Sequence, residues 1–329
     1  MIGYLALGTV ALSALFCAVY LRFARRRQIV DQPNQRSSHE LATPHGGGLP
    51  LLMAFLGALL VLFELRAEPW LAPYVWAAAA TGFLMLLGLV DDLRGLSVGV
   101  RFVSYAVVSL LTVFSMVYGH TELPPWQQLL LIACATVALL WLINLYNFMD
   151  GIDGIAGVQA VLACTAAAWF AQETDTLYSA VCLLLAAAHV GFLCFNWPPA
   201  RLFMGDTGSI PTGYLIGVLA LLGWTMDALN PLCWLVLLAL FILDASWTVS
   251  ARLLRKEDIS QGHRDHAYQR LSRHWNSHRA VDFLLIAVFL LWLLPIAWLI
   301  RKSPEYGLFL VILAYLPWVI GMANLRSLK

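Results

Sequence analysis

The sequence has 329 residues, of which 61% are hydrophobic and only 12% are charged, and its mean hydropathy is +0.77. Soluble domains carry roughly 25% charged residues, so this composition excludes an ordinary water-soluble globular protein. The formal net charge of +1 argues against a general polyanion-binding surface, and we expect no nucleic-acid partner. The composition predicts an integral membrane protein.

Apolar runs long enough to cross a membrane follow one another along the chain. A hydrocarbon core of about 30 Å requires about 20 apolar residues in a helix. Because these runs are continuously apolar and do not alternate, they predict helices and exclude a β-barrel. We therefore predict an all-α polytopic membrane protein with about eleven transmembrane helices in a single domain, residues 1–329. The predicted spans are 2–22, 48–65, 74–91, 101–118, 127–147, 155–171, 177–196, 209–226, 230–250, 281–300 and 306–324.

The basic residues predict how the spans cross the membrane. With the N-terminus outside and the C-terminus inside, seventeen of the 20 Lys and Arg residues lie on the cytoplasmic side, and only Arg66, Arg301 and Lys302 lie outside. This asymmetry follows the positive-inside rule. In the first span the charges follow the apolar run, so we expect a retained helix and not a cleaved signal peptide.

Five cytoplasmic loops hold nearly all of the unusual polar sequence. Two spans separate each loop from the next, and an even number of crossings returns the chain to the same face. All five loops can therefore contribute to one site. They are approximately residues 23–47, 91–101, 148–155, 197–209 and 251–280.

Five aspartates stand in three of these loops: Asp91, Asp92, Asp150, Asp153 and Asp206. Carboxylates held close together repel and raise one another's pKa values unless a cation joins them. An oxygen-only set without clustered Cys or His favours Mg²⁺, with Mn²⁺ as the alternative, over Zn²⁺. Because Mg²⁺ often binds one or two carboxylates together with substrate phosphates, the loops predict phosphate chemistry at the membrane surface.

Each of these motifs also has a purely structural interpretation. The Asp91-Asp92 pair is a candidate cap of the third span, and Asp206 is a candidate turn residue or helix N-cap. The glycines that follow Asp150 and Asp153 allow close helix packing. The run His45-Gly-Gly-Gly48 predicts a tight entry into the second span.

Other polar or reactive residues have similar alternatives. His189, in the middle of a span, predicts an interhelical hydrogen bond. Asp244 is costly in lipid, so it is either functional or positions the loop that follows it. The basic run 251–280 taken alone is a topology anchor or an anionic-lipid contact. The six cysteines all lie inside predicted spans and indicate apolar filling, not a disulfide or zinc framework.

Three motifs, in order, resemble those of the polyprenyl-phosphate N-acetylaminosugar-1-phosphate transferase family. They are Asp91-Asp92-Leu-Arg, Asn144-x-x-Asn147-x-x-Asp150-Gly-x-Asp153-Gly and Phe203-Met-Gly-Asp206-Thr-Gly-Ser. The resemblance extends from Asp31 to about Arg270. The loop with Arg36-Ser-Ser-His39 and Thr43-Pro-His45-Gly-Gly-Gly48 is similar to that of the branch that initiates lipopolysaccharide O-antigen chains.

The resemblance implies transfer of a sugar-1-phosphate from a UDP-N-acetylaminosugar to undecaprenyl phosphate, with release of UMP. It also implies Mg²⁺ dependence, a place in the EC 2.7.8 class, the bacterial inner membrane as location and, by analogy, a homodimer. The motifs place the metal at Asp206 and Asn147 and the substrates at Arg36, His39, Asn147, His263 and His266. They assign four catalytic aspartates: Asp91 and Asp92 would act at the lipid phosphate, and Asp150 and Asp153 at the nucleotide and diphosphate.

One motif departs from the family pattern. Many relatives have His-x-His-His where this chain has His263-Arg264-Asp265-His266, so one histidine is replaced and a charge pair is added. The departure argues against assuming UDP-N-acetylglucosamine as the donor.

Two other functions share some of these sequence features. An intramembrane prenyltransferase also uses aspartates and Mg²⁺, but Gly95 interrupts the Asp-Asp-x-x-Asp pattern that it would need. A lipid or solute transporter predicts broken helices and charges in the middle of the membrane, whereas the acids here lie at one face.

Overall fold

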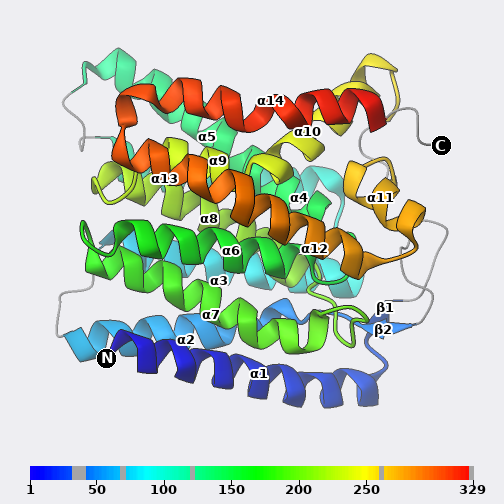
Figure 1. Cartoon of the computed structure of the whole chain (residues 1–329). Helices are drawn as coiled ribbons and strands as arrows, with labels where there is room; N and C mark the ends of the chain where they lie inside the picture. Colours follow the sequence, from blue (N-terminus) through cyan, green and yellow to red (C-terminus); the bar gives the residue numbers. More distant parts are fainter. Residues whose placement is uncertain (32–41, 67–71, 119–122, 259–262, 326–329) are drawn as a thin grey trace.

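The computed structural model describes residues 1–31, 42–66, 72–118, 123–258 and 263–325. Nearly all of these residues are helical, and the long helices run side by side along one common direction (Figure 1). The helices are α1 (Ile2–Arg27), α2 (Gly48–Arg66), α3 (Ala72–Arg94), α4 (Val98–Val117), α5 (Pro125–Met149), α6 (Ile155–Ala171), α7 (Thr176–Asn196), α8 (Asp206–Thr225), α9 (Pro231–Leu237), α10 (Ala239–Leu254), α11 (Ala267–Trp275), α12 (His278–Val288), α13 (Leu294–Lys302) and α14 (Gly307–Leu325).

The described residues confirm a polytopic helical membrane protein. Nine helices are long and apolar enough to cross a membrane, and the bent pair α9–α10 raises the number to ten. The remaining predicted span, 155–171, is the apolar helix α6, which is 17 residues long. Every predicted span therefore coincides with a helix or a helix pair.

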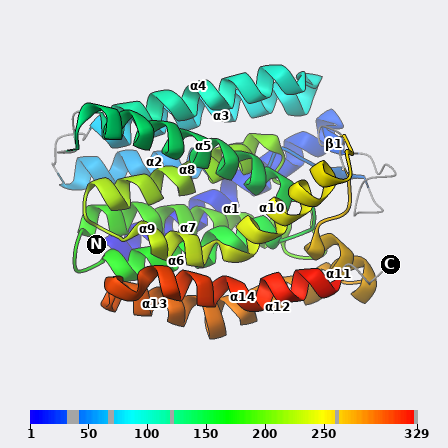
Figure 2. The ribbon, with the colours of Figure 1, turned by 90° about the horizontal axis from the view of Figure 1, so that it is seen from above.

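Helices α6, α7 and α8 form the centre of the bundle. Within an apolar stretch of 18 residues in each helix, 72% of α7 and 78% of α8 are buried inside the protein, against 17% of both α1 and α14. Small side chains permit the close approach, since α6 reads Ile-Ala-Gly-Val-Gln-Ala and is rich in alanine beyond that. Figure 2 shows α3 and α4 along one side of this centre and α12, α13 and α14 along the other.

Two spans are not regular helices. The predicted span 230–250 bends by 70° between α9 and α10. Gln159 of α6 donates to the carbonyl of Leu237 at 2.9 Å, which satisfies a backbone group at the bend. Between α12 and α13 a π-helical turn, Phe289–Leu293, precedes Pro295, whose ring lacks the N–H that a regular helix needs.

The loops between the spans add little regular structure. Two short strands, β1 (Val30–Asp31) and β2 (Thr43–Pro44), pair antiparallel. They lie at the same end of the bundle as α11, opposite the N-terminus (Figure 1). The amphipathic helix α11 arises inside 251–280, a range for which only a loop is predicted.

Candidate active site

An arginine links two of the predicted aspartates. Asp91 lies in the last turn of α3, Arg101 in the first turns of α4, and Asp206 is the first residue of α8. The Arg101 Nη1 atom is 2.9 Å from Asp91 Oδ2 and 3.4 Å from Asp206 Oδ2. Asp91 also accepts the backbone N–H of Leu96 at 2.5 Å. The ends of α3, α4 and α8 therefore converge on one guanidinium.

Sequence reasoning missed Arg101 as a site residue and counted it only as a topology charge. One signal was available, because Arg101 is the second arginine after the Asp91-Asp92 pair and stands at the start of the next span. The short connection between α3 and α4 keeps the ends of the two helices adjacent.

Asp92 has a different role from its neighbour. Its Oδ1 accepts the backbone N–H of Asp206 at 3.0 Å, and its Oδ2 accepts the N–H and the hydroxyl of Thr207 at 3.1 and 2.5 Å. The first N–H groups of a helix have no partner inside the helix, so Asp92 caps α8 from another span. Gly205, at φ +72°, leaves the room, since a Cβ atom there would lie 2.7 Å from Asp92 Oδ2.

Asn147 orients the carboxylate of Asp206. Its Nδ2 donates to Asp206 Oδ1 at 2.7 Å and to Ser209 Oγ at 2.9 Å. The two predicted metal ligands are therefore in contact, through the amide nitrogen of Asn147. The loop that contains His45 closes the same region, because Gly48 begins α2 and its Cα packs against Gly208. The tight entry predicted for His45-Gly-Gly-Gly48 is confirmed.

Asp150 follows the end of α5 and faces this group of charges. Burial raises the pKa of the Asp150 carboxyl well above its usual range, and the negative charges of Asp206, Asp92 and Asp153 raise it further. Arg101 is the cation that the structure shows bonded to two of the aspartates. The site therefore favours an additional cation.

The donor set fits a hard divalent cation. Asp91, Asp150 and Asp206 supply carboxylate oxygens, and the Asp206 side chain remains 26% exposed. In the described part of the chain, no three His, Cys, Asp or Glu side chains are placed so that they could hold a metal ion by themselves. Mg²⁺ suits this arrangement, because it binds through one or two carboxylates and completes its shell with phosphate oxygens and water.

Asp153 is tied to the neighbouring loops. Its Oδ2 accepts the backbone N–H of Ala200 at 2.9 Å and lies 3.4 Å from His278 Nδ1. The adjacent Gly154 donates its N–H to Asn196. Asp153 thus joins the loop after α5 to the loop before α8 and to the start of α12.

His266 and His263 form one wall of the site. His266 Nδ1 is 3.3 Å from Asp244 Oδ1, and the same carboxylate accepts the backbone N–H groups of Ala267 and Tyr268 at 2.9 and 3.0 Å. Asp244 therefore positions the loop that follows it, one of its two predicted roles. Tyr268 donates its hydroxyl to the carbonyl of Phe148 at 2.8 Å, which brings this wall to the end of α5.

The His263 ring stacks on His266 with centroids 5.0 Å apart. Burial lowers the pKa of His263 to about 4, and the neighbouring charges of His266 and Arg252 act in the same direction. The imidazole is therefore neutral at pH 7 and offers hydrogen bonds, not charge, to a substrate.

The remaining expectations have mixed outcomes. His189 contacts Thr212 of α8 at 3.2 Å, so the predicted interhelical hydrogen bond is confirmed. All six cysteines are free. The predicted substrate residues Arg36 and His39 lie outside the described residues.

The sequence is similar to those of known proteins. Residues 74–224 match the family model described as glycosyl transferase family 4. A Bacillus subtilis protein described as a probable undecaprenyl-phosphate N-acetylglucosaminyl 1-phosphate transferase is 28% identical over 301 residues, 89% of this chain and 82% of that protein. A phospho-N-acetylmuramoyl-pentapeptide-transferase of Heliobacterium modesticaldum is 30% identical over 229 residues, 62% of this chain and 68% of that protein.

A third relative is the decaprenyl-phosphate N-acetylglucosaminephosphotransferase of Mycolicibacterium smegmatis. It is 26% identical over 231 residues, 64% of this chain and 57% of that protein. The range that the family model matches includes the aspartates of α3, of the α5–α6 loop and of the start of α8. The chain belongs to glycosyl transferase family 4, the polyprenyl-phosphate sugar-1-phosphate transferases, and is a multi-pass membrane enzyme of that family.

Proposed function

We propose that the enzyme transfers an N-acetylaminosugar-1-phosphate from a UDP-sugar to undecaprenyl phosphate. An oxygen of the lipid phosphate attacks the β-phosphorus of the UDP-sugar, the bond from that phosphorus to the bridging oxygen breaks, and UMP leaves. The observation that carries the proposal is the convergence of Asp91, Arg101, Asn147, Asp150 and Asp206 where three membrane-spanning helices end. A tethered acceptor and a soluble donor would meet there, which supplies proximity.

The charged and neutral residues of the site have different roles. Mg²⁺, held by Asp206 with help from Asp91 or Asp150, would offset negative charge on the diphosphate. Arg101 pairs with Asp91 and Asp206 and keeps both carboxylates in fixed positions. Asn147 fixes Asp206 further. His263, whose imidazole is neutral, stacks on His266 on the other side.

We assign Asp91 to positioning and not to proton abstraction. The second pKa of a phosphate monoester is near 6, so the acceptor is already largely a dianion at pH 7. In addition, both oxygens of Asp91 are engaged, one by the Leu96 N–H and the other by Arg101. Held in this way, Asp91 fixes the position of the Arg101 guanidinium, the cationic side of the site.

We further propose that the product initiates a lipid-linked glycan in the bacterial inner membrane, most specifically lipopolysaccharide O-antigen. The loop Arg36-Ser-Ser-His39 supports this assignment. The altered motif His263-Arg264-Asp265-His266 supports a donor other than UDP-N-acetylglucosamine, because Asp265 pairs with Arg252 at 2.8 Å where relatives have a histidine. A homodimer is proposed by analogy. Membership of this family argues against the prenyltransferase and transporter alternatives.

The test is an incubation of purified protein with undecaprenyl phosphate, Mg²⁺ and a panel of UDP-N-acetylhexosamines labelled in the β-phosphate. We expect label in the organic phase with release of UMP, and loss of both in Asp206→Asn. Asp175→Asn is the matched control, because Asp175 caps α7 and lies outside the candidate site. Movement of the sugar without its phosphate would make this an ordinary glycosyltransferase and overturn the proposal.

A further inference from the structure

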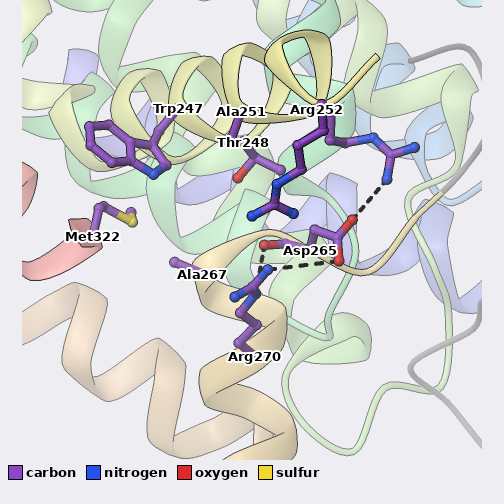
Figure 3. A pocket seen from close by; sticks show the side chains of 9 residues that line it. Trp247, Thr248, Ala251, Arg252, Asp265, Ala267, Arg270 and Met322 are labelled. Carbon is purple, nitrogen blue, oxygen red and sulfur yellow. Dashed lines mark hydrogen bonds and ion pairs between the residues drawn. The ribbon is translucent and has the colours of Figure 1, made fainter. Parts of the chain in front are cut away.

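A small cavity lies beside the candidate active site, between α10, the start of α11 and the end of α14 (Figure 3). Its volume is about 40 Å³. Trp247 and Met322 lie on one side of it, and Arg252, Asp265 and Arg270 lie on the other. The cavity is thus apolar toward the spans and charged toward the cytoplasmic loops.

The charged side has three arginines, which pair with two acids. Arg252 and Arg270 both reach Asp265, at 2.8 and 3.8 Å. Arg252 and Arg255, which also lines the cavity, reach Glu257 at 3.2 and 3.7 Å. The Arg252 side chain is only 10% exposed, and its Nε has no hydrogen-bond partner among the described residues. A buried guanidinium with an unused N–H is a donor for an anion.

A second group of arginines strengthens the positive field. Partial burial lowers the pKa of Arg273, and the positive charges of Arg264 and Arg270 lower it further, which shows that the three side chains are crowded. Arg273 donates to the carbonyl of Arg264 at 2.9 Å. Arg273 lies three residues after Arg270 on α11, so these two arginines share a helix face.

The apolar side belongs to the membrane. Trp247 and Met322 are contributed by α10 and α14, which both end near the cavity. Leu253 and Leu254, the last residues of α10, are 54% and 85% exposed, which suits contact with lipid and not with water. A ligand with an anionic head and an apolar tail satisfies both sides.

We propose that this cavity binds the phosphate of an anionic glycerophospholipid from the inner leaflet, with an acyl chain along Trp247 and Met322. About 10–15 Å³ accommodates one water-sized group, so the volume accepts the free oxygens of a single phosphate but not a nucleotide. The inference goes beyond the transferase reaction, because the cavity lies on the α14 side of α10 and its ligand is not consumed.

The lipid would also reach the active-site wall. Thr248 and Ala267 line the cavity, and both bond to Asp244, the carboxylate that holds His266. A bound headgroup would therefore stabilise the position of His266. The lipid composition of the inner leaflet would in this way influence the substrate site.

The test measures binding of labelled dioleoylphosphatidylglycerol to the purified full chain in neutral detergent micelles, with dioleoylphosphatidylcholine as the comparison lipid. We expect saturable binding of the anionic lipid only. Arg255→Gln and Arg270→Gln should each weaken it about fivefold, the effect of one cation near an anionic surface. Ala251→Val should abolish it, because two methyl groups enter the cavity while every arginine remains.

Arg25→Gln is the control of equal charge, since Arg25 is an exposed arginine at the end of α1. An equal loss in Arg25→Gln, or unchanged binding in Ala251→Val, would show a diffuse basic surface and overturn the proposal. Competition by inorganic phosphate alone would replace the lipid with a free anion and also overturn it. The binding readout needs no transfer, so failure of every donor in the transferase assay would leave this result intact.

Discussion

The carboxylate of Asp92 accepts the backbone N–H of Asp206 at 3.0 Å, so the acid at the end of one span caps the first turn of another. Its sequence neighbour Asp91 instead faces Arg101. Asp244 repeats the first arrangement, since it caps α11 from α10. The carboxylates at this end of the bundle therefore fall into two groups. Asp92 and Asp244 hold the first turns of other helices, whereas Asp91 is available to the reaction.

This division predicts that substitutions at Asp91 and Asp92 differ in their effect on stability. Asp92→Ala removes the cap of α8 and should lower the free energy of unfolding by about 1 kcal/mol, together with activity. Asp91→Asn should lower activity while thermal unfolding is almost unchanged, because its partner Arg101 is 31% exposed and stays hydrated. Unfolding followed by intrinsic fluorescence, beside the transfer assay, separates the two. Equal destabilisation would contradict the division.

Arg101 gives a prediction about metal affinity. Arg101→Gln removes the cation between Asp91 and Asp206 and leaves their charges uncompensated. The turnover number should fall about 10²–10³-fold, the range seen when one electrostatic group is lost from an active site. The Mg²⁺ concentration for half-maximal activity should also fall, because the site becomes more negative.

Arg94→Gln is the matched control for Arg101, since Arg94 is an exposed arginine near the same helix ends. A Mg²⁺ titration of the transfer assay measures both variants. A higher Mg²⁺ requirement in Arg101→Gln would show that Arg101 orients the ligands and does not compete with the metal.

The spans could be predicted from the sequence because length and apolarity alone determine them. It could also be predicted that the loops share one face. The contacts of Tyr268 with Phe148, of Asn147 and Asp92 with Asp206, and of Gly47 with Phe203 confirm it for all five loops. An even number of membrane crossings between two loops places them on the same face, and this number can be counted in the sequence alone. The two apolar stretches with internal breaks show the limit of this reasoning.

The bend after Leu237 could not be predicted, because neither proline nor glycine marks it and the satisfying donor, Gln159, comes from a distant helix. Arg101 was missed for a related reason. Its role depends on how the ends of α3, α4 and α8 converge, which the spacing of residues along one chain does not encode. The structural alternative for the Asp91-Asp92 pair is a cap of its own span, whereas Asp92 caps α8, and this partner also depends on the three-dimensional arrangement.

The pH dependence of Asp91→Asn tests its assignment to positioning. If Asp91 orients the cationic side of the site, the variant should lose the same fraction of rate at pH 6 and pH 9. If Asp91 removes a proton, the rate should recover at high pH, where the acceptor phosphate is fully ionised. A pH–rate profile of the variant against the unmodified enzyme decides, and recovery would overturn the assignment.

His263 predicts acid sensitivity of the wall around the site. Its pKa is about 4 in the folded protein, below the ordinary value of 6.5, so the unfolded state binds more protons between these values. Stability therefore falls as the pH drops from 6.5 toward 4. His263→Gln removes the titrating group, and its melting temperature should fall less over this range. His274→Gln, an exposed position on α11, should behave like the unmodified protein, whereas equal protection by both variants would place the acid sensitivity elsewhere.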